Sequence, residues 1–422
     1  MSDHLKLRVL LTSTTRWPSP SRLAVELSMA GFDVAALCRR RQHPLAKTRA
    51  VGRMFEYCAL RPIESLARAI AAADPALIVP CDDRAVSHLH ELHRRACSGP
   101  DPRRQSALIE RSLGAANGFN VVMSRYELLA TAKAEGLLVP QTMRIAIDDP
   151  EALSRGWQRF PCVVKADGTF AGQGVRVARN VEQAERALAD VTKLASAKQL
   201  LWQLIVNDDP FPLRPALTRP TGEVIAQAYV DGQDANCGVF CWEGEVLAGV
   251  AVEVVSTVGA VGPATVVRVV EGTEMMSAAV KIARRLQLSG FVGLDFVIER
   301  GSRDHYLIEM NPRCTPVCHL RLGGKRDMIG ALQRQLYGCG APERAAVTAN
   351  ELIAYFPSAR THAPEFLDRS YEDVPCNEPE LVEELLSPAP AASSVHRGAS
   401  RVLQEWVRLK AKHRVPTSPM AQ

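Results

Sequence analysis

The sequence is informative first through what it lacks. It has no stretch of the roughly 18 consecutive apolar residues that a membrane-spanning helix needs, and its amino-terminal apolar run is too short for a secretory signal. It has no long basic block in a folded segment, because 51 lysines and arginines are nearly matched by 46 acidic residues and the net charge is only +5. So mild a charge argues against a dedicated nucleic-acid binder. We therefore expect a cytoplasmic protein with no membrane span and no nucleic-acid partner.

Cysteines at metal-binding spacing are also scarce. The 11 cysteines are scattered mostly singly, which in a chain without a secretory signal predicts reduced thiols. Cys237 and Cys241 would share one face of a strand and are typical of a core. Cys314, Cys318 and His319 form a C-x3-C-H cluster, but a zinc site usually has four ligands and no second cluster is present. For these three residues we favour the lining of a substrate pocket over a zinc site.

Two nucleotide-binding signatures are missing, namely G-x-G-x-x-G after the first strand and G-x4-G-K-S/T anywhere. The first 117 residues instead alternate strands and helices at a spacing that favours parallel strands and an open α/β domain. The expected strands are residues 7–11, 32–37 and 76–80, and the expected helices are residues 21–30, 63–73 and about 85–95. Asp82 and Asp83, at the end of the third strand, could either meet a substrate or cap the helix that follows.

The strongest chemical pattern lies between Gly290 and His319. Residues 291–299 and 305–310 read as two strands joined by a polar turn. Asp295, Glu309 and Asn311 would then bring three oxygen-bearing side chains to one end of a hairpin, and such oxygens suit Mg²⁺ held together with substrate phosphates. Arg313 adds a positive fork for a phosphate or carboxylate. Each acid alone is as readily an exposed residue of a surface hairpin, but the four together favour a metal site.

A lysine and a glycine-rich loop form a second pattern. The strand that starts near Phe160 ends at Lys165, and Gly168, Gly172 and Gly174 follow before the next strand. Glycines allow backbone N–H groups to approach phosphate oxygens, and the lysine would supply a compact positive charge to them. The loop alone is also compatible with a flexible hairpin.

Two shorter features complete the pattern. Arg125 lies in the first turn of an expected helix, where an arginine is often merely solvated. The segment from Gln227 through Ala228 and Val230 reads as a strand entering a turn, and its backbone amides could pair with an adenine edge. Asp234, seven residues after Gln227, could accept hydrogen bonds from ribose hydroxyls.

These motifs, in this order, resemble those of the ATP-grasp superfamily. The ATP-grasp domains of carbamoyl-phosphate synthase and D-alanine–D-alanine ligase are of the type that the chain resembles. The resemblance covers about residues 1–340 and implies an α/β and α+β protein. In this layout an open α/β amino-terminal (pre-ATP-grasp) domain, 1–117, precedes a two-lobed ATP-grasp domain. The small lobe with the glycine loop would be 118–195, the large lobe with the adenine hinge and metal hairpin 196–340, and a carboxy-terminal extension 341–422.

The resemblance also implies roles for individual residues. The metal ligands would be Asp295, Glu309 and Asn311, which would hold two Mg²⁺ ions, with Mn²⁺ as an alternative. The catalytic residues would be Arg313 and Lys165. The ATP-binding residues would be Arg125, Lys165, Gly168, Gly172, Gly174, Gln227, Ala228, Val230 and Asp234. At the first phosphate position the family usually has an acid followed by lysine, whereas this chain has Ser124 and Arg125.

The implied activity is that of an ATP-dependent ligase. It would join a small-molecule carboxylate to an amine through an acyl phosphate and release ADP and phosphate. The alternatives are a phosphotransferase or carbamoyl-phosphate-forming enzyme of the same family, and a nucleotide-binding module without catalysis. A homodimer is the default assembly. Residues 257–265 and 314–319 are candidates for the acceptor pocket, in which His319 would be either a proton acceptor or a packed core residue.

Beyond residue 340 the resemblance fades. Residues 351–356 read as a strand, and residues 373–386 as a turn followed by a helix. Residues 387–394 have the composition of a linker. The basic, amphipathic segment 401–414 is typical of a docking helix with a solvated face, although it could touch an acidic partner or a membrane surface.

Overall fold

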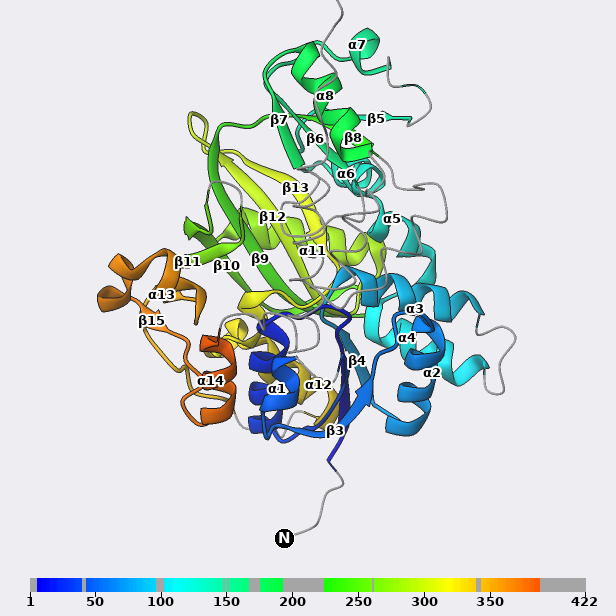
Figure 1. Cartoon of the computed structure of the whole chain (residues 1–422), viewed down its shortest axis with the longest axis vertical. Helices are drawn as coiled ribbons and strands as arrows, with labels where there is room; N and C mark the ends of the chain where they lie inside the picture. Colours follow the sequence, from blue (N-terminus) through cyan, green and yellow to red (C-terminus); the bar gives the residue numbers. More distant parts are fainter. Residues whose placement is uncertain are drawn as a thin grey trace, which may run out of the picture. The chain divides into compact units, whose positions relative to one another are not determined.

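The computed structural model describes residues 6–39, 43–95, 102–146, 149, 152–166, 175–192, 224–259, 262–338 and 343–387 (Figure 1). The glycine loop 167–174 and most of the predicted linker and basic segment, 388–422, lie outside these ranges. In the described part of the chain, no helix is both long and apolar enough to cross a bilayer.

The amino-terminal segment folds into a parallel sheet of order β3-β2-β1-β4, coloured blue in Figure 1. Its strands are β1 (Arg8–Thr12), β2 (Asp33–Cys38), β3 (Val51–Glu56) and β4 (Leu77–Pro80), and its helices are α1 (Ser19–Met29), α2 (Pro62–Ala73), α3 (Asp83–Arg95) and α4 (Pro102–Leu113). The predicted open α/β sheet is confirmed. Because all four strands are parallel, their carboxyl ends share one edge, where such sheets bind ligands.

A second, antiparallel sheet has the order β5-β8-β6-β7. Its strands are β5 (Thr142–Ile145), β6 (Cys162–Ala166), β7 (Val175–Ala178) and β8 (Val224–Ala228), accompanied by α7 (Ala152–Gly156) and α8 (Val181–Thr192). Trp157, Val164 and Leu188 fill the core between the sheet and α8. Strand β8 lies beyond the predicted lobe boundary at residue 195, yet it pairs with β5 and β6 and so belongs to this sheet.

The third sheet has seven strands in the order β13-β12-β9-β10-β11-β14-β15. Its strands are β9 (Gly232–Trp242), β10 (Glu245–Thr257), β11 (Ala264–Val270), β12 (Gly290–Glu299), β13 (His305–Asn311), β14 (Leu352–Ala354) and β15 (Tyr371–Glu372). The last two come from the carboxy-terminal extension, which therefore completes this sheet. One face packs on α11 (Thr273–Leu286) and α6 (Arg125–Ala134), where Cys237 and Cys241 are buried as predicted.

The opposite face of the same sheet meets the segment that follows β13. This segment contains the short turns η4 (Pro316–His319) and η5 (Gly324–Arg326) and the helix α12 (Met328–Tyr337). The extension adds α13 (Ser358–His362), η6 (Pro364–Arg369) and α14 (Pro379–Leu386). Smaller elements are η1 (Pro44–Lys47), η3 (Ala116–Gly118) and α5 (Phe119–Met123). Val317, Phe240 and Val9 belong to one core, so the parallel sheet, η4 and the seven-stranded sheet pack together.

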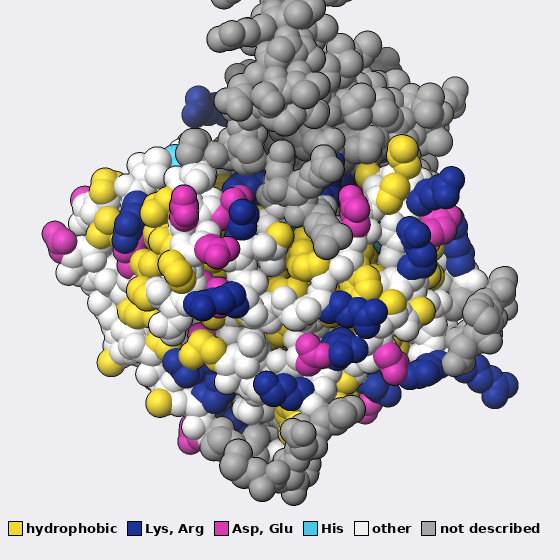
Figure 2. Space-filling view, turned by 60° about the horizontal axis from the view of Figure 1, so that its bottom comes forward, with side chains coloured by type: hydrophobic (Ala, Val, Ile, Leu, Met, Phe, Trp, Pro, Cys, Tyr) yellow, Lys and Arg dark blue, Asp and Glu magenta, His cyan; other side chains and the backbone are white. Residues whose placement is uncertain are grey.

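The molecular surface carries both signs of charge. On the face shown in Figure 2, lysines and arginines lie interspersed with acidic and hydrophobic side chains, and they form no continuous basic stripe on that face. The described cysteines are all free.

Candidate functional site

Two carboxylates face each other near the end of the β12–β13 hairpin. Asp295 is paired in register with Glu309, and a β-bulge follows directly, because Phe296 pairs with Leu307 rather than with Ile308. Burial and then the charge of Glu309 raise the pKa of Asp295 to about 7. Burial and a neighbouring carboxylate both disfavour the ionised form of an acid, and a bound cation would favour it. The strand pattern predicted this juxtaposition, and the structure brings the two acids together.

Arg125 compensates one of the two acids. Its Nη2 lies 2.6 Å from Glu309 Oε1, and the arginine and glutamate side chains are 13% and 26% exposed. Arg125 is placed by the start of α6, where the Ser124 hydroxyl accepts a hydrogen bond from the N–H of Glu127 at 3.2 Å and caps the helix. Although burial acts in the opposite direction, Arg125 and then Lys165 hold the pKa of Glu309 below its ordinary value.

Asn311 and Arg313 continue the polar network from Asp295. Asn311 Nδ2 donates to Asp295 Oδ2 at 2.9 Å, and Arg313 Nη2 donates to Asn311 Oδ1 at 2.9 Å. Arg313 Nε also reaches both oxygens of Asp83 at 3.2 Å, across 230 residues of sequence. Against the effect of burial, Asp83 raises the pKa of Arg313. The arginine is therefore a fixed cation, held between the metal hairpin and the carboxyl end of β4.

Lys165 lies buried at the end of β6, and its charge reaches the same cluster. Its Nζ donates to Gln227 Oε1 at 2.8 Å, and burial lowers its pKa against the opposing charges of Glu309, Asp295 and Asp234. Burial in turn raises the pKa of Asp234, against the charge of Lys165. A lysine of the second sheet thus interacts electrostatically with three acids of the third.

The predicted adenine hinge needs a correction at Ala228. Its backbone N–H already donates to the carbonyl of Gln141 at 2.8 Å, so it is not open to a ligand. In the described ranges the N–H of Val230 has no hydrogen-bond partner, so its predicted role stays open. A hollow of about 500 Å³ lies beside the hinge, lined among others by Tyr126, Leu138, Tyr229 and Tyr306. Gly168, Gly172 and Gly174 lie outside the described residues.

Asp82 and Asp83 have separate roles. Buried Asp82 accepts from the backbone N–H groups of Thr14 and Ala85 at 2.6 and 2.9 Å, so it caps α3 and fixes the loop after β1. Its neighbours Ser13 and His43 do not form a catalytic triad with it. His43 Nδ1 accepts from the Leu45 N–H at 3.1 Å, so Nε2 carries the proton and cannot act as a base toward Ser13. Asp83 is the residue that contacts the site, through Arg313.

The zinc alternative for Cys314, Cys318 and His319 is not supported. Cys318 Sγ accepts a hydrogen bond from the Thr315 N–H at 3.2 Å, and His319 Nε2 is hydrogen-bonded to Asp373. No group of three or more His, Cys, Asp and Glu side chains in the described ranges is arranged to hold a metal. The magnesium prediction is of another kind, because it rests on two acids and an amide, with substrate phosphates as further ligands.

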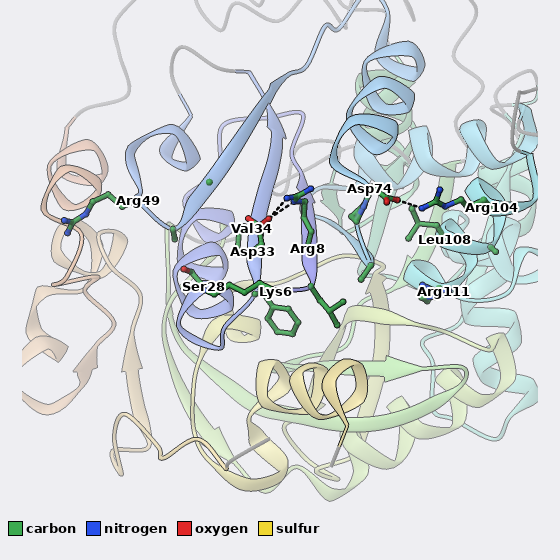
Figure 3. A pocket seen from close by; sticks show the side chains of 17 residues that line it. Lys6, Arg8, Ser28, Asp33, Val34, Arg49, Asp74, Arg104, Leu108 and Arg111 are labelled. Carbon is green, nitrogen blue, oxygen red and sulfur yellow. Dashed lines mark hydrogen bonds and ion pairs between the residues drawn. The ribbon is translucent and has the colours of Figure 1, made fainter. Parts of the chain in front are cut away.

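A larger hollow, of about 850 Å³, opens at the amino ends of the parallel strands (Figure 3). Its acids are already paired, Asp33 with Arg8 at 2.6 Å and Asp74 with Arg104 at 2.5 Å. It lies at the edge opposite Asp82 and Asp83, whereas ligands of open α/β sheets bind at the carboxyl ends. We therefore do not assign the reaction to it.

The three sheets, with acids and cations gathered between two of them, define an ATP-grasp fold. Comparison with known families agrees, because residues 130–316 match the carbamoyl-phosphate synthase L chain, ATP binding domain. Residues 130–316 thus match an ATP-binding domain of the kind that the sequence resembled, so the resemblance is confirmed for this part of the chain, and the predicted fold class is confirmed. A stretch of 154 residues is 25% identical to the carbamoyl phosphate synthase large chain of Caldanaerobacter subterraneus subsp. tengcongensis. It covers 36% of this chain but only 13% of that protein.

Solved structures share the fold at low sequence identity. N5-carboxyaminoimidazole synthetase from Staphylococcus aureus, complexed with ADP, is 14% identical over 78% of each chain, with a TM-score of 0.52. An L-amino acid ligase from Bacillus licheniformis is 13% identical over 81% of this chain and 76% of that one, with a TM-score of 0.53. The biotin carboxylase domain of Hydrogenobacter thermophilus 2-oxoglutarate carboxylase, in complex with MgADP, is 13% identical over 78% and 70%, with a TM-score of 0.52.

Proposed function

We propose that this protein is an ATP-dependent ligase that joins a small carboxylate to an amine through an acyl phosphate, releasing ADP and phosphate. One observation carries the proposal: Asp295 and Glu309 face each other in register, among Arg125, Arg313 and the buried Lys165. The solved neighbours support it, since an L-amino acid ligase is among them. The substrates would be small metabolites in the cytoplasm, and a homodimer is the default assembly.

The residues fit Mg²⁺. Asp295 and Glu309 are two facing carboxylates, and burial together with the charge of Glu309 raises the pKa of Asp295. A divalent cation could be held by Asp295, Glu309 and the amide oxygen of Asn311, with nucleotide phosphates as the remaining ligands. When bound, the metal would neutralise phosphate charge. We propose two Mg²⁺ ions, with Mn²⁺ as an alternative.

The chemistry requires that anions approach one another. A carboxylate oxygen attacks the γ-phosphorus of ATP only if the repulsion between the two groups is screened. Lys165 and Arg125 would bind the phosphates, and Arg313, fixed by Asp83 and Asn311, would stabilise the transferred phosphoryl group. These cations are preorganised by hydrogen bonds within the protein, so little reorganisation accompanies the reaction. No nucleophilic side chain is required, because the substrate carboxylate is itself the nucleophile.

The remaining ATP contacts follow the sequence analysis. Gln227, Val230 and Asp234 would face the adenosine, and Gly168, Gly172 and Gly174 would cover the phosphates. Ala228 would contribute through its carbonyl rather than its N–H group. The two alternatives, a phosphotransferase or carbamoyl-phosphate-forming enzyme and a binding module without catalysis, keep the same nucleotide site and differ in the products.

The proposal is tested by supplying ATP, Mg²⁺ and hydroxylamine with a panel of L-amino acids and other small carboxylates. The expected products are ADP and the hydroxamate of one carboxylate class, detected by mass. Glu309→Gln is expected to abolish ADP formation while the circular dichroism spectrum stays that of the wild type. Nucleotide binding without any ADP release across the panel would favour the binding module. ADP release with a phosphorylated product that hydroxylamine does not trap would favour the phosphotransferase.

A further inference from the structure

A buried histidine–aspartate pair joins the loop after the metal hairpin to the carboxy-terminal extension. His319 Nε2 and Asp373 Oδ2 lie 2.7 Å apart, and the two side chains are 6% and 4% exposed. Asp373 is itself fixed, because its Oδ1 accepts from the Phe356 N–H at 2.6 Å. A carboxylate acceptor at Nε2 places the imidazole proton on that nitrogen and leaves Nδ1 as the basic one.

The other ring nitrogen of His319 is available. In the described part of the chain, Nδ1 has no hydrogen-bond partner, whereas Nε2 is held by Asp373. A packed core histidine normally uses both nitrogens or buries the second among apolar atoms. Here one nitrogen is anchored by an acid and the second has no partner in the described ranges, which is the arrangement of a histidine that can accept a proton.

The loop that carries His319 is pressed against the site. A Cβ on Gly293, the residue paired with Asn311, would lie 2.4 Å from Thr315 Cγ2, so only glycine fits under this loop. The Cys314 N–H donates to the Pro80 carbonyl at 3.2 Å, which ties the loop to the carboxyl end of β4. Arg313 begins the loop and His319 ends it. The loop thus lies between the metal hairpin and the edge where open α/β sheets bind ligands, and His319 stands at its end.

We propose that His319 accepts the proton of the amine substrate, and that Asp373 is the positioning residue that holds its tautomer. This inference rests on the proposed ligase function and assigns the amine side of the site. In the step, the amine nitrogen attacks the acyl carbon of the acyl phosphate and forms the C–N bond. The acyl C–O bond breaks and phosphate leaves with its electron pair. The proton lost by the nitrogen passes to His319 Nδ1.

Other ionisable groups also face this pair. Arg22 on α1 lies 3.7 Å from Asp373, and Cys318 belongs to the same turn as His319. Tyr355 and Tyr371 interact with Asp373 from the extension, and burial raises the pKa of both. Glu26 on α1 acts on Tyr371, and β9 packs Gly238 against this turn. The Asp373 carboxylate thus lies between the guanidinium of Arg22 and the imidazole of His319.

The test compares two nucleophiles in His319→Gln and in a control, His362→Gln, whose histidine is exposed on α13. Hydroxylamine is largely unprotonated at neutral pH and needs no base, whereas amino acid amines are protonated. In His319→Gln, hydroxamate formation should stay within about twofold of wild type, while amide formation should fall about 100-fold or more. The control should match wild type with both nucleophiles. Raising the pH should partly restore amide formation, since more of the amine is then unprotonated.

The outcomes are separable. Amide formation by His319→Gln at the wild-type rate, or an equal loss of both products, overturns the inference. If His319→Gln does not fold, Asp373→Asn carries the test, because asparagine can still accept from the Phe356 N–H. That variant should lower the kcat for the amide, leave hydroxamate formation intact, and shift the acid limb of the amide pH profile; an unchanged profile contradicts the role of Asp373. A wild type that makes no hydroxamate from any carboxylate refutes the ligase function itself.

Discussion

Arg125 Nη2 lies 2.6 Å from Glu309 Oε1, which ties the first turn of α6 to strand β13 across 184 residues of sequence. Arg125 helps to hold the pKa of Glu309 below its ordinary value, whereas the pKa of Asp295 is raised. Two neighbouring carboxylates with pKa values pushed apart by their surroundings are characteristic of a reactive site.

Replacement of Arg125 should weaken nucleotide use. Arg125→Met removes a charge-assisted contact of the kind that contributes about 1.5–3 kcal/mol, so the KM for ATP should rise about tenfold or more. Arg186→Met is the matched control, because Arg186 is 70% exposed on α8 and pairs only with Glu182. Steady-state kinetics at saturating carboxylate measure the effect. Equal KM values for the two variants would contradict a phosphate contact by Arg125.

Lys165 should matter more for turnover than for folding. Lys165→Met removes a buried cation that interacts with both acids, and loss of one such preorganised group lowers kcat about 100-fold. Lys165→Arg should not restore activity, since the planar guanidinium does not fit a buried position bonded to Gln227. Lys281→Met, at an exposed position on α11, is the control. Full activity of Lys165→Arg would show that only the charge counts.

Replacement of Asp82 should mainly lower stability, whereas replacement of Asp83 should mainly lower activity. In the wild type the buried carboxylate of Asp82 accepts hydrogen bonds from backbone N–H groups. Asp82→Asn replaces one carboxylate oxygen by an NH₂ group that cannot accept them, so the Tm should fall by several degrees. Asp83→Asn should leave the Tm nearly unchanged, since this side chain is 26% exposed, but it should lower activity through Arg313. Thermal melts and ADP release measured on both variants decide the matter. The reverse pattern would contradict these assignments.

Acid should destabilise the protein through His43. Burial lowers the pKa of His43 to about 4, below its ordinary value of 6.5. The folded state thus binds fewer protons than the unfolded state between these values, so this group's stabilisation is complete above pH 6.5 and is lost as the pH falls toward 4. The loss should reach about 3 kcal/mol at 1.36 kcal/mol per pKa unit.

The matched variant for this prediction is His43→Asn, which can still accept from the Leu45 N–H at the start of η1 but does not titrate. Its free energy of unfolding in urea should change less than that of wild type between pH 6.5 and 4. Because His90 is also buried with a lowered pKa, a residual acid dependence is expected. An identical pH slope in both proteins would show that His43 is not the group involved.

Local patterns predicted much of this structure. The alternation of side chains predicted the β12–β13 hairpin. Apolar runs, apolar periodicity and helix-ending glycines predicted β1, β2, β4 and most of the helices beside them. Strand β3 was not expected, because its residues are mostly exposed or half-buried and show no apolar alternation. Helix α4 was also not expected, because three of its 12 residues are arginines and its apolar residues are few.

Long-range partners were beyond the reach of sequence patterns. Nothing near Asp83 indicates that it pairs with Arg313, or near Asp373 that it pairs with His319, since these contacts depend on how the sheets pack. The hinge shows the same limit. The spacing indicated where Ala228 lies, but only the pairing of β8 with the segment before β5 reveals that its N–H is already used.

The central claim is that the hairpin acids and Lys165 converge on one magnesium nucleotide. Calorimetric titration with a non-hydrolysable ATP analogue, with Mg²⁺ and with a chelator, tests it most directly. The wild type should bind tightly only with Mg²⁺, and the Asp295→Asn, Glu309→Gln double variant should bind equally weakly under both conditions. A double variant that retains the full Mg²⁺ enhancement would contradict the claim.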